Sequence, residues 1–450
     1  MLKVLVVDDD KAVTNYFMVF LMQTGRFETT VLNDSRQVCD HLKQEEFDVM
    51  LLDMDMPHIS GLDVLRNMQQ HSIEIPVIVI TGVSDLEMAV KAMKRGAFDY
   101  LTKPIDDEKL LEVIDSAIAH HTIHEDIQQL PEELKREDLA HAKAFKKLPT
   151  QDQEMIRLFH QAEKLADSDL SIFIWGENGT GKEPLARAIH AASERKDGPF
   201  IAIDADSQDR EAFPTFFFGR DAEAGSELDG APGILEQADR GTIFLNNIDS
   251  LSTPVQVRLK RVIQEGEFNR ESSAKIRKVN VRLIVSSTVD LASSEYKQKF
   301  SRDLLYHLMV NSLRIPPLRD RVDDIPLLAG HFLAQAAEEA DKQIQGFSDS
   351  FVGTLQKYPF PNNTRELSDI VYRSVANCDG SILKADCLPP QVQDAVKNGR
   401  VEFAEFNPRS LSEVVREYVR QTLDHFDGNR VATLKALGIE EEVLDRVLGE

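Results

Sequence analysis

The chain has 450 residues, a formal net charge of −24, and 28% charged and 42% apolar residues. This length allows about two to four globular domains, each with its own core. The acidic balance disfavours diffuse attraction to nucleic acid or anionic membranes, so contact with DNA would need a local basic patch. No apolar run approaches the roughly 18 residues needed to cross a membrane, and the N-terminal MLKVLVVDDD predicts a strand rather than a signal peptide. The cysteines lack metal-ligand spacing, which predicts free thiols in a reducing cytoplasm: they are Cys39, Cys378 and Cys387.

Residues 1 to about 122 alternate apolar strands with helical patterns five times, which predicts a parallel sheet covered by helices on both faces. Ligands of such sheets bind beyond the carboxyl ends of the strands. Carboxylates that meet at one edge repel one another unless a hard cation lies between them, and Mg²⁺ suits these oxygen ligands. The alternative is a set of solvated loop acids. The strand ends that predict this magnesium site are Asp8-Asp9-Asp10 and Asp53, and the neighbouring ends carry Thr81 and Lys103, a hydroxyl and a cation that suit an incoming phosphoryl group.

This segment resembles the receiver domain of two-component response regulators through the motifs VVDDD, LLDMDMPHISG, VITG and AFDYLTKP. The resemblance implies that a sensor histidine kinase phosphorylates Asp53. It implies that Asp9 and Asp53 bind Mg²⁺ directly, that Asp8 acts through water, and that the backbone carbonyl of Asp55 completes the site. It further implies that Thr81 and Tyr100 form a switching pair. Lys103 would bind the phosphoryl group, and the peptide bond between Lys103 and Pro104 would be cis.

A charge-rich segment, residues 123–150, follows the receiver-like domain. Its pattern predicts a helix that ends at Pro149, as in a signalling linker. The periodicity is compatible with a dimerising helix but is too short and weak to establish a coiled coil.

A glycine-rich turn follows the apolar run 170–175 and leads into a helical pattern from Leu185. In this strand–loop–helix order, backbone N–H groups surround the phosphates of a nucleotide. The spacing G-x-x-x-x-G-K is complete, with Glu183 where general phosphate loops carry Ser or Thr. A glycine-rich surface turn is the alternative. The predicted nucleotide-binding residues are Gly176, Glu177, Asn178, Gly179, Thr180, Gly181, Lys182 and Glu183.

Residues 151–325 resemble the AAA+ domain of NtrC-type, sigma-54-dependent activators, and residues 326–395 resemble its helical lid. The resemblance rests on GENGTGKE, GILEQADRGTIFL, VRLKRVIQEGEF, LRIPPLRDRVDDIPLL and YPFPNNTREL. It implies an α/β domain that binds ATP or ADP, with a phosphate contact from Arg365.

The positions that perform ATP hydrolysis in this family carry other residues here. The family's Asp-Glu pair, which orients Mg²⁺ and polarises water, is Asn246-Asn247, and an amide cannot take up a proton near neutral pH. Ser301 and His307 replace the two arginines that reach a neighbouring subunit, and Thr288 replaces a sensing asparagine. Loss of a base slows a reaction by about 10²- to 10⁴-fold, and loss of such arginines by about 10³- to 10⁵-fold. We therefore expect bound nucleotide without efficient hydrolysis, hence no ATPase enzyme; an empty, structural domain is the alternative.

The family's sigma-54 contact loop, Gly-Ala-Phe-Thr-Gly-Ala, is also changed. The matching stretch 220–232 reads RDAEAGSELDGAP and lacks the phenylalanine tip. In place of that tip it has Glu223, Glu227 and Asp229, as a solvated acidic loop would. We therefore expect that the protein does not remodel sigma-54 polymerase.

Residues 408–450 resemble the Fis-type helix-turn-helix domain through the turn 428–430 and the sequence ALGI at 436–439. The third helix of such a domain enters the major groove. Here the charged residues from Glu440 onward are all acids except Arg446, and phosphates repel acids. DNA binding is therefore left open, and retention as a dimerisation unit is favoured.

The predicted fold class is α/β: a doubly wound five-stranded receiver, an AAA+ domain with a helical lid, and a small all-α C-terminal domain. The three modules predict a cytoplasmic, phosphorylation-controlled transcription regulator of the NtrC type. The alternative is an interaction switch that does not bind DNA and regulates a partner through phosphorylation- and nucleotide-dependent assembly. A full ATPase activator is the third hypothesis. The expected partners are a sensor histidine kinase, further copies of the chain, and a related regulator or RNA polymerase.

Overall fold

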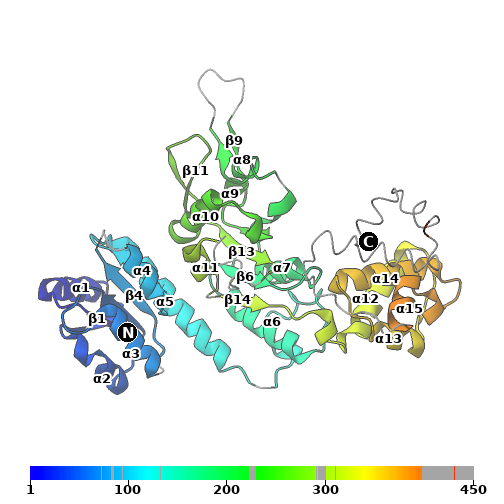
Figure 1. Ribbon diagram of the computed structural model, residues 1–450, viewed down its shortest axis with the longest axis horizontal. Helices are drawn as coiled ribbons and strands as arrows, with labels where there is room; N and C mark the ends of the chain where they lie inside the picture. The colour runs from blue at the N-terminus through cyan, green and yellow to red at the C-terminus, as the bar shows by residue number, and fades with distance from the viewer. Residues whose placement is uncertain are drawn as a thin grey trace. The chain divides into compact units, whose positions relative to one another are not determined.

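The computed structural model describes residues 1–71, 73–82, 86–93, 95–131, 133–207, 209–221, 230–289, 291, 300–309, 311–397 and 430. The chain divides into two compact units, Met1–Pro389 and Pro390–Glu450. Figure 1 shows the fold and labels some of the helices and strands named below. Among the described residues, no helix combines the length and apolar character that a membrane span requires.

The first sheet is parallel, with the strand order β2-β1-β3-β4-β5. Every residue of the third strand, VMLLD, is buried, as expected for a strand covered on both faces. Helices cover both faces and enclose two separate apolar cores. The elements are β1 Leu2–Val7, α1 Lys11–Gln23, β2 Phe27–Leu32, α2 Val38–Gln44, β3 Val49–Asp53, α3 Gly61–Gln70, β4 Val77–Thr81, α4 Leu86–Met93, β5 Asp99–Thr102 and α5 Asp107–Gln128. The predicted doubly wound sheet is confirmed.

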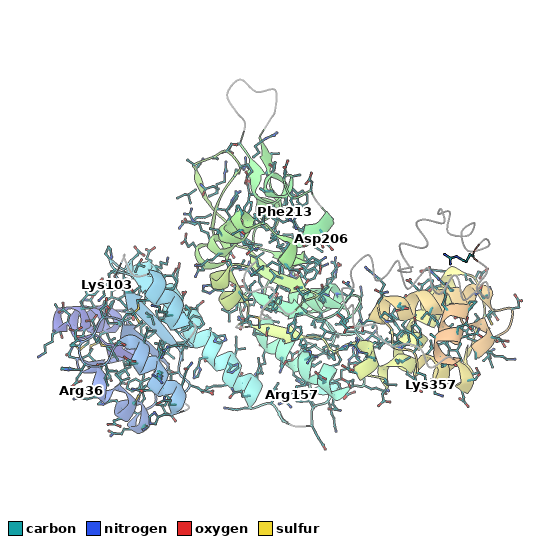
Figure 2. All side chains as sticks on the ribbon, in the orientation of Figure 1. Arg36, Lys103, Arg157, Asp206, Phe213 and Lys357 are labelled. Atoms are coloured by element: carbon teal, nitrogen blue, oxygen red, sulfur yellow. The ribbon has the colours of Figure 1, made fainter. Side chains whose placement is uncertain are left out.

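A second parallel sheet has the order β14-β6-β13-β10-β7. Phe213, labelled in Figure 2, packs with the rings of Phe217 and Phe218 in the larger of its apolar cores. The elements are α6 Gln153–Ala166, β6 Ile172–Trp175, α7 Lys182–Ala192, β7 Phe200–Asp204, α8 Phe213–Phe218, β8 Gly219–Arg220, β9 Ala231–Pro232, α9 Ile234–Gln237, β10 Thr242–Asn246, α10 Thr253–Glu265, β11 Glu267–Asn269, β12 Ile276–Lys278, β13 Arg282–Ser287, α11 Arg302–Met309 and β14 Ser312–Arg314.

Arg282, the first residue of β13, is 1% exposed although it carries a charge. Its guanidinium donates to the backbone carbonyls of Leu165 (2.6 Å), Ala166 (3.2 Å) and Leu170 (3.2 Å). These carbonyls lie at and just beyond the C-terminus of α6, where a cation is favoured. Burial lowers the pKa of Arg282 to about 10, so the side chain stays charged at neutral pH. It ties α6 to the centre of the sheet.

The lid that follows is helical, as predicted. Its elements are α12 Asp324–Glu339, β15 Gly346–Phe347, α13 Asp349–Leu355, α14 Asn363–Asn377 and β16 Ile382–Leu383. A further helix, α15 Pro390–Lys397, begins the second unit.

The helical linker expected over 123–150 is wrong beyond Gln128, where α5 ends. Within the described part of the segment, the chain forms a 3-10 turn at Arg136–Asp138 and further turns. Phe145, fully buried, packs in the core that includes α6. The Glu163 carboxylate of α6 accepts the backbone N–H of Ala140 (3.1 Å). These contacts with α6 stabilise the turns more than the weak helical pattern stabilises a helix.

Two predictions lie outside the described residues. They are the acidic loop with Glu223, Glu227 and Asp229, and, apart from Arg430, the helix-turn-helix expected over 408–450.

Candidate functional sites

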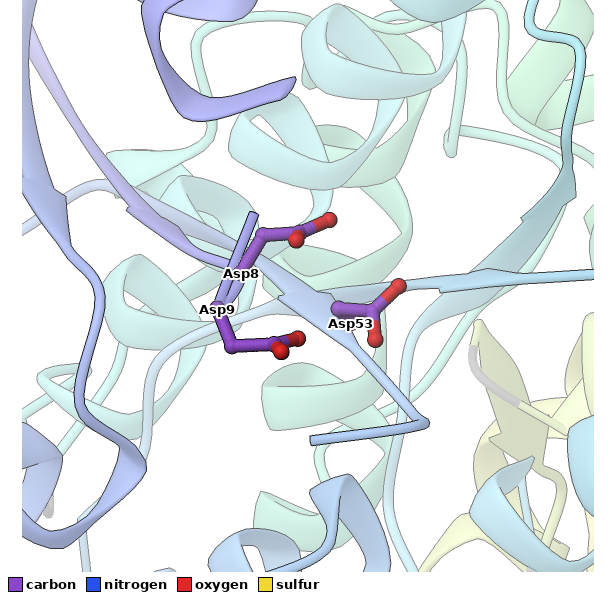
Figure 3. Close-up of side chains that lie close together, drawn as sticks. All are labelled: Asp8, Asp9 and Asp53. Carbon is purple, nitrogen blue, oxygen red and sulfur yellow. The ribbon is translucent and has the colours of Figure 1, made fainter. Parts of the chain in front are cut away.

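Three carboxylates gather at the carboxyl edge of the first sheet (Figure 3). Asp8 and Asp9 follow β1, and Asp53 ends the adjacent strand β3, so the parallel register brings them together. One ligand oxygen from each lies within 4.8 Å of the others. Asp8 and Asp53 are 1% and 4% exposed, whereas Asp9 is exposed. This oxygen-rich, partly buried set is of the kind that binds a hard divalent cation.

A lysine faces these acids from the loop after β5. The Lys103 Nζ, labelled in Figure 2, donates to Asp53 Oδ1 (2.6 Å) and to Asp8 Oδ2 (3.1 Å). Burial lowers the pKa of Lys103, but the hydrogen bonds and charges of the two carboxylates outweigh it, so that the pKa is raised. Burial, and then the nearby Asp53 charge, raise the pKa of Asp8 despite Lys103. One lysine therefore leaves three carboxylates incompletely balanced, and a divalent cation fits the residues present.

The remaining receiver residues surround the same edge. The buried Thr81 Oγ1, at the end of β4, has no hydrogen-bond partner among the described residues, and its predicted switching role stays a prediction. Tyr100 is half-buried on β5, and its switching role stays a prediction. The backbone N–H of Asp55 donates to Asp53 Oδ2 (2.8 Å). The peptide bond between Lys103 and Pro104 is cis, which confirms that expectation.

The phosphate loop lies between β6 and α7, as the sequence predicts. Gly179 and Gly181 have φ values of 74° and 105°, which favour glycine. Lys182, 8% exposed, donates its Nζ to the carbonyls of Gly176 (2.7 Å) and Glu177 (3.1 Å). Burial lowers the pKa of Lys182 to about 8, although the charges of Asp249, Asp204 and Glu177 act in the opposite direction. The Glu183 carboxylate pairs with Arg187 (2.6 Å).

Residues of the lid contact the backbone of the phosphate loop, which the sequence did not predict. Asn363 Nδ2 donates to the carbonyl of Asn178 (2.9 Å), and the N–H of Thr364 donates to that of Gly179 (3.0 Å). A Cβ on Gly179 would lie 2.1 Å from the carbonyl oxygen of Asn362, so this position requires glycine.

Arginines also lie at the phosphate loop: Arg319 and Arg321 come from the chain just before the lid, and Arg365 comes from the lid itself. Arg319 binds the Glu177 carboxylate through both terminal nitrogens (2.6 and 2.7 Å). Arg321 donates to the carbonyl of Thr180 (3.3 Å). The exposed Arg365 has its Cβ 3.1 Å from the position of an added Cβ on Gly179, so it lies beside the phosphate loop.

Amides, not acids, lie at the end of β10 in the second sheet. Asn246 Nδ2 donates to Asp204 Oδ2 (2.8 Å), and Asn247 Nδ2 donates to Asp204 Oδ1 (3.0 Å). Asp204 ends β7, the neighbouring strand, in register with Asn246. On the other side, Ser286 Oγ donates to Asn246 Oδ1 (2.6 Å), and Ser287 Oγ donates to Asp249 Oδ1 (2.7 Å). The sequence analysis missed Asp204 and Asp249.

The other changed positions hold local contacts. The N–H of Ser301 donates to the Gln256 side chain (2.7 Å), and the His307 Nε2 lies 2.6 Å from Gln264 Nε2. Thr288 is half-buried just after β13. These residues offer no guanidinium at the predicted arginine positions.

Three family models match the chain in succession. The response regulator receiver domain matches residues 4–115, the sigma-54 interaction domain matches residues 148–314, and the AAA+ ATPase lid domain matches residues 319–404.

Several relatives match over nearly the whole chain. The regulatory protein AtoC of Escherichia coli is 33% identical over 98% of this chain and 96% of its own length. The transcriptional regulatory protein ZraR of Escherichia coli is 33% identical over 98% and 97%. The response regulator protein PilR of Pseudomonas aeruginosa is 31% identical over 97% and 96%. Among solved structures, NtrX from Brucella abortus in complex with ADP has a TM-score of 0.52 and 27% identity, covering 100% of this chain and 99% of NtrX.

A receiver fold with an acidic pocket, followed by a sigma-54 interaction domain and an AAA+ lid, defines a response regulator of a two-component system. With relatives a third identical across almost its full length, the chain belongs to the NtrC family of such regulators.

Proposed function

We propose that the protein is a phosphorylation-controlled transcription regulator that binds ATP or ADP but does not hydrolyse it efficiently. In this proposal a sensor histidine kinase phosphorylates Asp53, with Mg²⁺ held by the three receiver carboxylates and Lys103 bound to the phosphoryl group. The observation that supports the receiver part is the 2.6 Å contact between Lys103 Nζ and Asp53 Oδ1, because an ammonium beside Asp53 would balance the charge of an acyl phosphate formed there.

Two observations support nucleotide binding. The phosphate loop has the backbone that the motif requires, with a buried lysine and the first turn of α7 beside it. In addition, structures of the similar NtrX from Brucella abortus are described as complexes with ADP and with ATP. We therefore assign nucleotide binding to residues 176–183, with Arg365 beside them.

The amides at the end of β10 support the proposal that ATP hydrolysis is weak. Asn246 and Asn247 both direct their N–H groups at Asp204, and neither can accept a proton from water. In the same proposal, the protein does not remodel sigma-54 polymerase, because the contact loop lacks its phenylalanine.

The test combines calorimetry with a phosphate-release assay on the full chain. ADP and ATP are expected to bind in the calorimeter, while phosphate release stays below one turnover per minute. Release at several turnovers per minute would contradict the proposal, and a chain that binds neither nucleotide would favour the empty, structural domain.

A second candidate function follows from the acids in the helix predicted from Glu440. Their charge opposes DNA binding and favours a function that does not need it. In this alternative the protein is an interaction switch whose assembly responds to phosphorylation and nucleotide. Mobility shifts with genomic fragments at low and moderate salt separate the two: salt-resistant binding to defined sites supports a DNA regulator. Mass measurement in solution, with and without a phosphoryl donor and ATP, then tests whether assembly itself changes.

A further inference from the structure

Asp204 lies at the end of β7, where it accepts hydrogen bonds from both amides of the neighbouring strand. Its Oδ2 accepts Asn246 Nδ2 (2.8 Å), and its Oδ1 accepts Asn247 Nδ2 (3.0 Å). The backbone N–H of Asp206, labelled in Figure 2, donates to the same Oδ1 (3.0 Å). Three donors therefore converge on one carboxylate, one strand away from the position where the family resemblance expects the acids.

The orientation of Asn246 is fixed from its other side as well. Its Oδ1 accepts the Ser286 hydroxyl (2.6 Å), so its Nδ2 must face Asp204. An acid at 246 or 247 would replace an N–H donor by an oxygen about 3 Å from Asp204. Two carboxylates at this separation cannot both stay ionised without a cation or a shared proton.

The same contacts limit what Asp204 can do itself. A carboxylate has about four lone-pair positions, and three donors already occupy its two oxygens. It is therefore a poor substitute for a general base that must take a proton from water.

We infer that Asp204 is a positioning residue of the nucleotide site, which holds the amides of Asn246 and Asn247 and prevents an acid from being accommodated there while position 204 is itself acidic. The inference rests on the proposed nucleotide-binding function and deepens it. Restoring an acid at the end of β10 then requires a reciprocal change at the end of β7.

The backbone of Asn247 determines which substitution is informative. Its φ and ψ are 56° and 48°, a left-handed conformation that Asn and Asp tolerate better than other side chains. Asn247→Glu would add backbone strain to the charge effect. Asn247→Asp preserves both shape and backbone tolerance, so it isolates the charge.

The experiment is a thermal-unfolding cycle on the full chain without nucleotide, with wild type, Asn247→Asp, Asp204→Asn and the double variant that carries both. Asn247→Asp is expected to lower the unfolding midpoint at pH 8 by about 5 °C or more, because two carboxylates then face each other. Asp204→Asn is expected to lower it because the amides lose their anionic acceptor. The double variant restores one carboxylate and one amide, and should unfold within about 2 °C of wild type.

A pH series provides a readout that a packing defect would not change. In Asn247→Asp the facing acids share a proton, so one of their folded-state pKa values is strongly raised. A raised carboxyl pKa stabilises the folded state at low pH and loses that contribution as pH rises. The deficit of Asn247→Asp is therefore expected to shrink between pH 8 and pH 5, unlike that of Asp204→Asn.

Asn269→Asp is the matched control. It adds the same charge on β11, where the side chain lies 3.4 Å from Arg261, and should leave the midpoint within about 2 °C of wild type. Additive losses in the double variant, or an Asn247→Asp midpoint equal to wild type at pH 8, would overturn the inference. Calorimetric titration of wild type with ADP is measured separately, so failure to bind would refute the proposed function while the cycle still decides the pairing.

Discussion

Both parallel sheets of this protein have polar side chains at the carboxyl edge, but the charges of these side chains differ between the two sheets. In the first sheet, three carboxylates lie within reach of one another and one lysine. In the second, two amides lie at the end of β10, and the carboxylate of Asp204 ends the neighbouring strand β7. Strand topology provides the location in both cases. The chemistry depends on the charge of single side chains at the strand ends.

The electrostatic balance of the two edges explains this difference further. The acids of the first edge are incompletely balanced, so the edge suits a cation followed by a phosphoryl group. At the second edge each amide N–H has an acceptor on Asp204, and Ser286 binds the remaining oxygen of Asn246. The first edge therefore fits a cation and the proposed phosphoryl group, whereas Asp204 and Ser286 bind the amides of the second edge within the protein.

The largest expected effect is loss of phosphorylation when Asp53 is replaced, which would show that the first edge performs phosphoryl chemistry. Asp53→Asn removes the carboxylate that would form the acyl phosphate, so phosphorylation by acetyl phosphate and Mg²⁺ should be lost entirely. Intact-protein mass spectrometry measures the added phosphoryl group. Asp55→Asn is the control, since the metal role predicted for residue 55 belongs to its backbone carbonyl, and it should retain phosphorylation. A phosphorylated Asp53→Asn protein would place the acceptor elsewhere.

A smaller effect is expected at the phosphate loop. Lys182→Ala removes a buried ammonium beside the predicted phosphates and should weaken ADP binding by about 10- to 100-fold, the range of a charge-assisted hydrogen bond. Isothermal calorimetry measures the change. Lys357→Ala, an exposed lysine of the lid labelled in Figure 2, is the matched control and should bind as wild type does. Equal affinity in Lys182→Ala and wild type would remove the lysine from the site.

The smallest effect is a dependence of ADP affinity on pH. Burial lowers the pKa of Lys182 to about 8, and bound phosphate should raise it by favouring the charged form. Binding then takes up a proton, so affinity is expected to fall as pH rises above 8, by at most about tenfold per pH unit.

Calorimetry at pH 7, 8 and 9 measures this slope. Lys182→Arg stays charged over this range, so a variant that still binds should show a flatter dependence. A wild-type affinity that is constant from pH 7 to pH 9 would contradict the role of Lys182 charge.

The sequence predicts the strands whose residues are buried in continuous apolar runs, such as β3 and β10. It also predicts the acid pocket, because residues that follow parallel strands meet at one edge. The three-residue edge strand β14, Ser312–Arg314, escapes prediction because it is short and partly exposed. The turns beyond Gln128 escape because packing on α6 outweighs local propensity.

Asp204 shows why part of a site is hidden from spacing alone. It is 42 residues from Asn246, and no motif links the two. The available signal is that each follows an apolar strand, which predicts a common sheet edge but neither adjacency nor hydrogen-bond direction. The lid contacts are hidden for the same reason, since Asn363 is 185 residues from Asn178.

The lid contacts have a mechanical consequence. Asn363, Thr364 and Arg321 all donate to backbone carbonyls of the phosphate loop, and Arg319 binds Glu177. A ligand that shifts the loop carbonyls must stretch or replace these bonds, so lid and loop respond to it as one body. Under the proposed function, in which nucleotide binds without efficient hydrolysis, the binding and release of the ligand would by themselves change the contacts between loop and lid.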